Sequence, residues 1–403
     1  MRKVLYLILM MCLTSPTIVT AKTAPVVRER ILTQLQKSQK MIEAGEYSKS
    51  FELLNELSEA ELSNYEHSQV YKLLAYQFFQ SNEYSKAIPY YQKILQLEDL
   101  PQFTVDESLY SLSQLYFSVE DYVSAEKMLS QWFEHNPDAG VQAYELQGQI
   151  YYQLKQKAKA IESLTKAIQL NQQNNKPPRQ NWLQMLQGLY YESGDKPSTI
   201  KTVEQLIHYY PKTVYWLQLA GLYGEQEQIG RQLYVMDAAY TEGLLNRESE
   251  LKNLAYLYID QKVPYQAAKV LQKGLDAKQI APTEKNLQLL ANAWRMAKEI
   301  KPSIEALELA AKKATHGNLY AELAQLYLQD EQYKQAESAA NQAIEKGSLK
   351  QIGQLYNTLG IALFKQHRYA SAKQAFTKAK QDPEAKKTAL QWVKYVESFE
   401  GKS

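Results

Sequence analysis

Apolar side chains recur at helical spacing along most of the chain, in short segments joined by polar turns. The clearest example is residues 356–379, where Leu359 and Leu363 lie four positions apart, as do Ala372 and Phe376. Residues three or four positions apart lie on the same face of an α-helix. The stretch therefore predicts two amphipathic helices separated by a turn.

Both predicted helices carry very small residues among their apolar ones. Gly360 lies inside the first helix, where glycine costs about 1 kcal/mol relative to alanine. Ala372 lies on the apolar stripe of the second helix, four positions before Phe376. Small residues allow two helix backbones to approach closely, so the pair predicts a tight crossing of two helices.

The same pattern recurs along the chain with a mean spacing of about 36 residues. We call the first position of each copy its anchor and give later positions as offsets from it. The ten anchors are Gln34, Tyr71, Leu109, Tyr144, Leu183, Trp216, Leu251, Leu287, Tyr320 and Tyr356. Repeats of this length indicate a stack that grows by one helical unit at a time.

The pattern resembles the tetratricopeptide repeat, W-x2-L-G-x2-Y…A-x3-F…P, with tyrosine replacing tryptophan in the best copy. That copy consists of Tyr356, Leu359, Gly360, Leu363, Ala372, Phe376, Ala379 and Pro383. The resemblance covers roughly residues 31–383 and implies an all-α solenoid of about ten helix-turn-helix repeats. In that family Gly360 and Ala372 would face each other where the two helices of a repeat cross.

The organisation predicted along the chain has three parts. Residues 1–21 form a signal peptide, residues 22–383 form the repeat solenoid, and residues 384–403 form a capping helix and tail. The weakest repeat is 213–246, where three glycines cluster between Gly221 and Gly230. We expect a flexible joint at 221–235.

The first 21 residues have the features of a secretory signal. Arg2 and Lys3 precede a ten-residue apolar run, and a small residue, Ala21, provides a cleavage position. The run is well short of the roughly 20 residues that span a bilayer, although retention as an anchor stays open. The one cysteine, Cys12, lies inside this run, so cleavage leaves no disulfide. We expect a periplasmic protein.

Composition and motifs argue against catalysis. Removing Arg2 and Lys3 leaves equal numbers of basic and acidic side chains, which does not suit a nucleic-acid binder. The five histidines are far apart, and neither an HExxH zinc motif nor a phosphate-binding loop occurs. The sequence therefore predicts no catalytic residues, no metal and no cofactor.

A protein-binding groove is predicted on the first helix of each repeat, since the resemblance implies that this helix lines a concave surface. Aromatic and amide residues predominate at offsets +5 and +8, and they suit recognition of a peptide or helix. The predicted groove residues are Tyr76, Phe79, Gln114, Phe117, Gln149, Tyr152, Tyr191, Tyr256, Asn292 and Arg295. The aromatic members have a second interpretation, which is packing against neighbouring helices.

A narrower resemblance concerns the partner. A signal peptide followed by degenerate repeats rich in tyrosine and glutamine looks like the tetratricopeptide proteins encoded with TonB/ExbB/ExbD energy-transduction systems of Gram-negative bacteria. That resemblance implies contact with periplasmic parts of the TonB complex and a role in iron uptake. Two alternatives stay open, namely an adaptor in envelope assembly or peptidoglycan synthesis, and a scaffold that self-associates.

Overall fold

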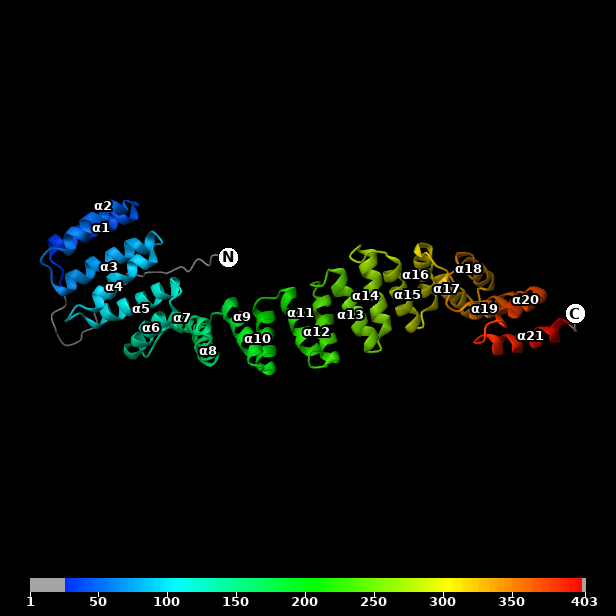
Figure 1. Ribbon diagram of the computed structural model, residues 1–403. Helices are drawn as coiled ribbons and strands as arrows, with labels where there is room; N and C mark the ends of the chain where they lie inside the picture. Colours follow the sequence, from blue (N-terminus) through cyan, green and yellow to red (C-terminus); the bar gives the residue numbers. More distant parts are fainter. Residues whose placement is uncertain (1–25, 401–403) are drawn as a thin grey trace. The chain divides into compact units, whose positions relative to one another are not determined.

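The computed structural model describes residues 26–400, which form twenty-one α-helices and no strand (Figure 1). The odd-numbered helices are α1 (Glu29–Glu43), α3 (Asn64–Gln80), α5 (Gln102–Ser118), α7 (Val141–Gln153), α9 (Gln180–Glu192), α11 (Thr213–Gly224), α13 (Glu248–Asp260), α15 (Glu284–Met296), α17 (Asn318–Gln329), α19 (Ile352–Lys365) and α21 (Lys386–Glu400). The even-numbered helices are α2 (Tyr47–Ser58), α4 (Tyr84–Leu95), α6 (Tyr122–His135), α8 (Lys157–Gln173), α10 (Lys196–Tyr209), α12 (Ile229–Thr241), α14 (Pro264–Asp276), α16 (Ile300–Lys313), α18 (Tyr333–Lys346) and α20 (Tyr369–Ala379). The predicted all-α solenoid is confirmed, and the predicted signal peptide lies outside the described residues.

The helices follow the predicted register closely. Each of the ten anchors lies in an odd-numbered helix from α1 to α19, and an even-numbered helix follows each. The chain divides into two compact units, of which the first ends at Gly194 and the second begins at Asp195. Residues 221–235, where the joint was predicted, belong to α11, α12 and their turn within the second unit. The joint itself stays a prediction.

The turn between the two helices of a repeat has one geometry throughout. In all ten repeats the residue at offset +11 has a positive φ, between 56° and 75°. Only two of these residues are glycine, and the ten are Gly45, Asn82, Glu120, Lys155, Gly194, Glu227, Lys262, Lys298, Glu331 and His367. Non-glycine residues adopt this left-handed conformation at a cost. Packing of the flanking helices therefore imposes the turn on sequences that do not favour it.

The two helices of a repeat cross at offsets +4 and +20. A Cβ atom on Gly360 would lie 2.6 Å from the ring of Phe376, and one on Gly148 would lie 2.8 Å from the side chain of Leu164. Both pairs join offset +4 to offset +20. The atoms nearest to a Cβ on Gly360 thus belong to Phe376, and the facing of Gly360 and Ala372 that the family resemblance implies stays a prediction. The glycine makes room for a ring, because a ring needs more space than a methyl group.

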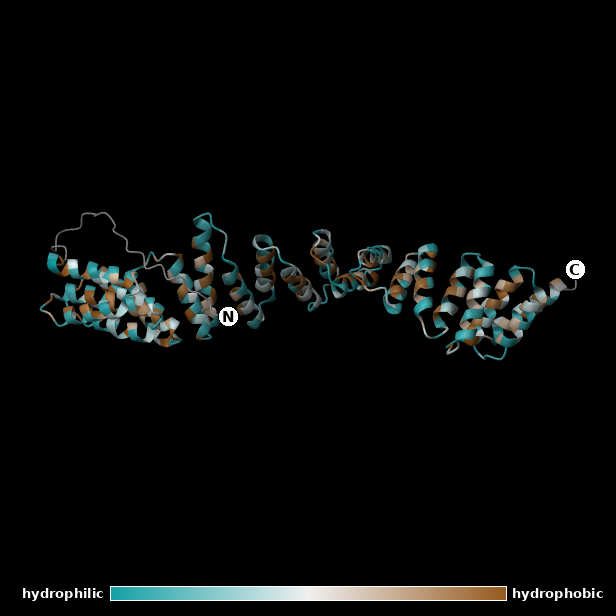
Figure 2. Ribbon diagram, turned by 90° about the horizontal axis from the view of Figure 1, so that it is seen from above, coloured by the Kyte–Doolittle hydropathy of each residue, from teal (hydrophilic) through white to brown (hydrophobic). Residues whose placement is uncertain are grey.

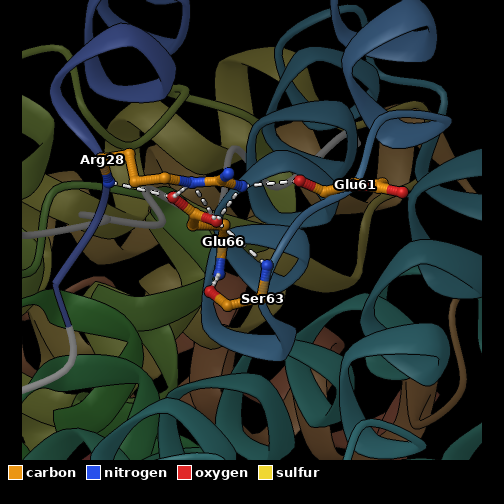
Figure 3. A network of polar contacts seen from close by, with 4 residues as sticks. All are labelled: Arg28, Glu61, Ser63 and Glu66. Carbon is orange, nitrogen blue, oxygen red and sulfur yellow. Dashed lines mark hydrogen bonds and ion pairs between the residues drawn. The ribbon is translucent and has the colours of Figure 1, made fainter.

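A polar network joins α1 to the following helix pair in the first unit (Figure 3). The Arg28 guanidinium donates hydrogen bonds to both carboxylate oxygens of Glu66 on α3, the shortest at 2.7 Å, and to the backbone oxygen of Glu61 at 2.6 Å. Ser63 caps α3, and Glu66 completes its capping box. Hydrogen bonding from Arg28 holds the pKa of the buried Glu66 carboxyl down, from 4.5 to about 2.

Aromatic packing joins α21 to the last repeat in the second unit. The ring of Trp392 stacks on Phe376 with centroids 5.5 Å apart. Phe364 contacts the rings of Trp392, Tyr395 and Phe399. Helix α21 therefore covers the aromatic side chains of α19 and α20.

Hydrophobic residues alternate with hydrophilic ones along the individual helices (Figure 2). Offsets +3, +4, +16 and +20 are buried in most repeats, as a stack of helix pairs requires. Within residues 26–400, no helix is both long enough and apolar enough to cross a bilayer.

Candidate protein-binding face

The ten predicted groove residues all lie on odd-numbered helices. Seven belong to α3, α5, α7 and α9 of the first unit, and three belong to α13 and α15 of the second. Successive residues of an α-helix are rotated by 100°, so offsets +1, +5 and +8 fall within about 60° of one another around each helix. We call the surface formed by these three offsets the odd-helix face.

Lys72 and Glu145, which lie on this face at offset +1, join neighbouring odd-numbered helices. In the first unit, Lys72 on α3 pairs with Glu107 on α5 at 2.5 Å. Further along, Glu145 on α7 accepts hydrogen bonds from Arg179, the shorter at 2.7 Å, and from the Trp182 indole at 2.9 Å. Arg179 directly precedes α9 and Trp182 lies on it. These contacts place α3 beside α5 and α7 beside α9.

The second unit has an equivalent connection. Glu248 on α13 accepts hydrogen bonds from the Asn286 side chain on α15 at 2.9 Å and from the Ala281 backbone N–H at 3.0 Å. These hydrogen bonds lower the pKa of the Glu248 carboxyl. Helix α13, which carries Tyr256, therefore lies beside α15, which carries Asn292 and Arg295.

Three of the predicted residues are exposed tyrosines. Tyr152 is 40% exposed and Tyr191 is 56% exposed in the first unit, and Tyr256 is 52% exposed in the second. Exposed tyrosines present a large apolar ring and a polar hydroxyl at low conformational cost. They are the exposed aromatic side chains of this face, and their rings can be buried against a partner.

Phe79 and Phe117 have a different environment. Each is only half-buried, but its ring packs on the tyrosine five residues later in the same repeat, with centroids 5.5 Å apart. The partners are Tyr84 and Tyr122, at the start of the second helix. For these two residues the packing interpretation holds in part, because each ring stabilises the turn of its own repeat.

The amide members are half-buried and make local hydrogen bonds. Gln149 donates to Glu145 at 3.4 Å, and Asn292 accepts from Arg295 at 2.9 Å. Arg295 also lies close enough to Glu322 to lower the pKa of that carboxyl, although burial dominates and raises the pKa overall. Tyr76 and Gln114 are half-buried as well.

Sequence reasoning missed the carboxylates that connect the repeats. Glu145 and Glu248 look like ordinary helix-surface residues in the sequence. Their partners lie more than 30 residues further along the chain, as a stacking contact requires. The family pattern contains no carboxylate at these positions, so it gave no signal for them.

The chemistry available on the odd-helix face is recognition by aromatic rings, amides and paired charges. Within the described part of the chain, no group of three or more histidine, cysteine, aspartate or glutamate side chains is placed to hold a metal ion. The face can bury apolar area and exchange hydrogen bonds with a polypeptide.

Comparison with known families identifies the repeats. A tetratricopeptide repeat profile matches residues 141–174, and a second tetratricopeptide repeat profile matches residues 321–386. The chain contains tetratricopeptide repeats. Proteins of this family are typically interaction scaffolds without catalytic activity. A search of curated proteins gave no match.

Several solved structures are similar to parts of the chain. One is described as the MamA protein, with 17% identity, coverage of 52% of this chain and 94% of that one, and a TM-score of 0.31. Another is YrrB, described as a TPR protein with an unusual peptide-binding site, with 13% identity, coverage of 48% and 97%, and a TM-score of 0.38. A third is Naa15/Naa10 bound to HypK-THB, with 13% identity, coverage of 91% and 66%, and a TM-score of 0.43. These likenesses concern the fold alone.

Proposed function

We propose that this tetratricopeptide repeat protein is a non-catalytic periplasmic scaffold that binds a partner polypeptide on its odd-helix face. The observation that carries the proposal is the exposure of Tyr152, Tyr191 and Tyr256 on helices whose other faces are packed into the stack. Aromatic residues are enriched where proteins bind one another, because they bury large areas with few rotatable bonds.

The proposed partner is a periplasmic segment of a TonB/ExbB/ExbD-type complex. The proposal takes its support from the predicted signal peptide and from the resemblance of the repeats to proteins encoded with such systems. In that role the scaffold assists energy transduction to outer-membrane receptors for iron uptake. It forms no covalent intermediate and needs no cofactor.

The test is an affinity capture of the tagged full chain from crosslinked cell envelopes, with co-purifying proteins identified by mass spectrometry. The binding-face variant combines Tyr152→Ala, Tyr191→Ala and Tyr256→Ala. We omit Phe117, because its half-buried ring packs on Tyr122 and its removal would weaken the repeat itself.

The control combines Val123→Ala and Leu309→Ala, which remove exposed apolar side chains from even-numbered helices. We expect TonB, ExbB or ExbD homologues with the wild-type and control chains and a loss of at least about tenfold with the binding-face variant. Equal recovery with all three chains would place the binding surface elsewhere.

Capture of a different partner would change the proposed pathway but not the assignment of the odd-helix face as the binding surface. Recovery of wall-synthesis or assembly proteins, lost in the binding-face variant, would favour an adaptor in the envelope. Recovery of untagged copies of this chain alone would favour a self-associating scaffold, which light scattering would then measure.

A further inference from the structure

A pocket of about 350 Å³ lies in the second unit at the least regular repeat. Its lining is mostly apolar and comes from three consecutive helices, α10, α11 and α12. The lining residues are Glu204, Ile207, Trp216, Leu219, Tyr223, Arg231, Tyr234 and Val235. This volume falls at the lower end of the range for ligand pockets.

The pocket is distinct from the odd-helix face. On α11 it uses offsets 0, +3 and +7, whereas the face uses +1, +5 and +8. These two sets point about 140° apart around the helix axis. In this repeat, moreover, the positions at offsets +5 and +8 of the face are glycines, Gly221 and Gly224. A ligand in the pocket would therefore contact another side of the stack.

The following repeat shows why a cavity is present here. At the same offsets that repeat has Leu251 and Leu254, which are completely buried. Trp216 is only half-buried, and its indole Nε1 is enclosed without a hydrogen-bond partner among the described residues. An enclosed N–H without a hydrogen-bond partner destabilises the folded state. Packing in the sixth repeat is thus incomplete where the seventh repeat is filled.

The polar edge of the pocket has no excess charge. Burial raises the pKa of the Tyr223 hydroxyl, which has Glu204 and Arg231 as its charged neighbours, and the Arg231 guanidinium lies 5.7 Å from the Tyr223 ring centroid. One carboxylate and one guanidinium beside each other do not favour an anionic or cationic ligand. They complement a neutral peptide group, which carries one donor and one acceptor.

Tyr234 is the residue at the pocket with most surface to lose. It is 76% exposed, more than any other tyrosine among the described residues, and it lies beside an apolar cavity. An apolar cavity of about 150 Å³ holds benzene, so about 350 Å³ has room for an indole ring and adjoining backbone atoms. Offset and edge-to-face ring contacts with Tyr234 and Trp216 would then add to the buried area.

We propose that this pocket is a second binding site, which takes one large aromatic side chain from an uncharged segment of a partner polypeptide. The inference goes beyond the proposed binding face, because it uses other residues and, on α11, another side of the helix. Its occupant is defined by the apolar lining, the volume and the neutral polar edge together.

The test uses methyl NMR on the full chain carrying labelled isoleucine, leucine and valine methyl groups. The probe is the neutral peptide acetyl-Gly-Trp-Gly-amide, titrated to about 10 mM because a peptide of this size binds weakly. The methyl groups of Ile207, Leu219 and Val235 report on the pocket directly. Acetyl-Gly-Gly-Gly-amide is the matched probe without the aromatic ring.

We expect the three pocket methyl signals to shift with the tryptophan peptide and not with the triglycine peptide. Tyr234→Ala should weaken this binding at least about threefold, the loss of one ring contact, whereas Tyr265→Ala on α14 should leave it unchanged. An unchanged methyl spectrum elsewhere shows that each variant is folded.

Two results would overturn the proposal. One is the absence of pocket shifts with the tryptophan peptide. The other is a set of shifts that survives Tyr234→Ala or that centres on Ile259, at offset +8 of the odd-helix face. Neither result bears on the capture experiment, whose binding-face variant leaves the pocket intact.

Discussion

The first and the last repeat follow one plan with opposite chemistry. At the helix crossing, the last repeat places Gly360 against the ring of Phe376. The first repeat has Ser38 and Leu54 at the same offsets, and the Ser38 hydroxyl forms a buried hydrogen bond of 2.7 Å with that of Ser50. One crossing is filled by a ring and the other is joined by two hydroxyls.

The outer contacts differ in the same way. The first repeat is attached to α3 by the charged Arg28–Glu66 pair, and the last repeat is covered by the stacked ring of Trp392. The two repeats therefore place their contacting side chains at the same positions, but one uses polar and charged contacts where the other uses aromatic packing. We expect the first repeat to respond to pH and the last to respond to changes in volume.

The largest effect is expected for Phe376→Ala in the last repeat. Phe376 is completely buried, and truncating such a ring costs about 3 to 5 kcal/mol. Hydrogen exchange over residues 352–400 should accelerate strongly, while exchange over residues 29–58 stays the same. Leu54→Ala is the counterpart in the first repeat and should affect residues 29–58 and α3, whose Val70 and Leu74 share its core cluster. Slow exchange over 352–400 in the Phe376 variant would show that the ring is not a core residue.

The next largest effect is expected from acid, which should weaken the attachment of the first repeat. The pKa of Glu66 is lowered from 4.5 to about 2, so the folded state binds its proton less readily than the unfolded state. The stabilisation is complete above pH 4.5 and is lost as the pH falls toward 2. Hydrogen exchange over residues 29–58, corrected for the pH dependence of the intrinsic exchange rate, should become faster between pH 6 and pH 3 as this stabilisation is lost.

Glu66→Gln is the control for acid sensitivity. It should weaken the first repeat at pH 6 and remove this carboxyl's share of the pH dependence, because no charge is left to titrate. The last repeat, held by aromatic rings, should show the smaller change over the same pH range. Identical pH profiles for Glu66→Gln and wild type would contradict the assignment.

Gly360→Ala, which adds a methyl group at the helix crossing of the last repeat, should lower the free energy of unfolding by about 1 to 3 kcal/mol. The Cβ of Gly360→Ala would lie 2.6 Å from the Phe376 ring, which is enclosed and cannot move away. The control is Gly221→Ala on α11, where a Cβ meets nothing within 4 Å. That change should stabilise its helix by up to about 1 kcal/mol. Thermal unfolding would separate the two, and equal melting temperatures would mean that the crossing is loose.

The smallest effect concerns the turn that the two repeats share. The first repeat has Gly45 at offset +11 with φ of 75°, and the last has His367 with φ of 60°. His367→Gly should stabilise the last repeat, and Gly45→Ala should destabilise the first, each by about 0.5 to 1 kcal/mol. Denaturant unfolding would measure both changes. A destabilising His367→Gly would show that the histidine side chain supports the turn.

The sequence predicted the order of the helices well and the role of individual side chains less well. The spacing of apolar residues located all ten anchors correctly, because helical periodicity and the length of the repeat are local properties. The spacing did not show that Phe117 is half-buried and Tyr152 exposed, because both residues have offset +8. Phe117 packs on Tyr122, whereas the corresponding position after Tyr152 is Lys157, which instead pairs with Glu192 at 3.1 Å.

By itself, then, the sequence determined the fold class, the number of repeats and the helix that carries each candidate binding residue. These follow from patterns of about 36 residues that each repeat contains in full. The tertiary structure decided which aromatic rings stay exposed, which carboxylates join successive repeats, and where the sixth repeat leaves a pocket. Those features depend on contacts between side chains of different helices, and only packing brings these side chains together.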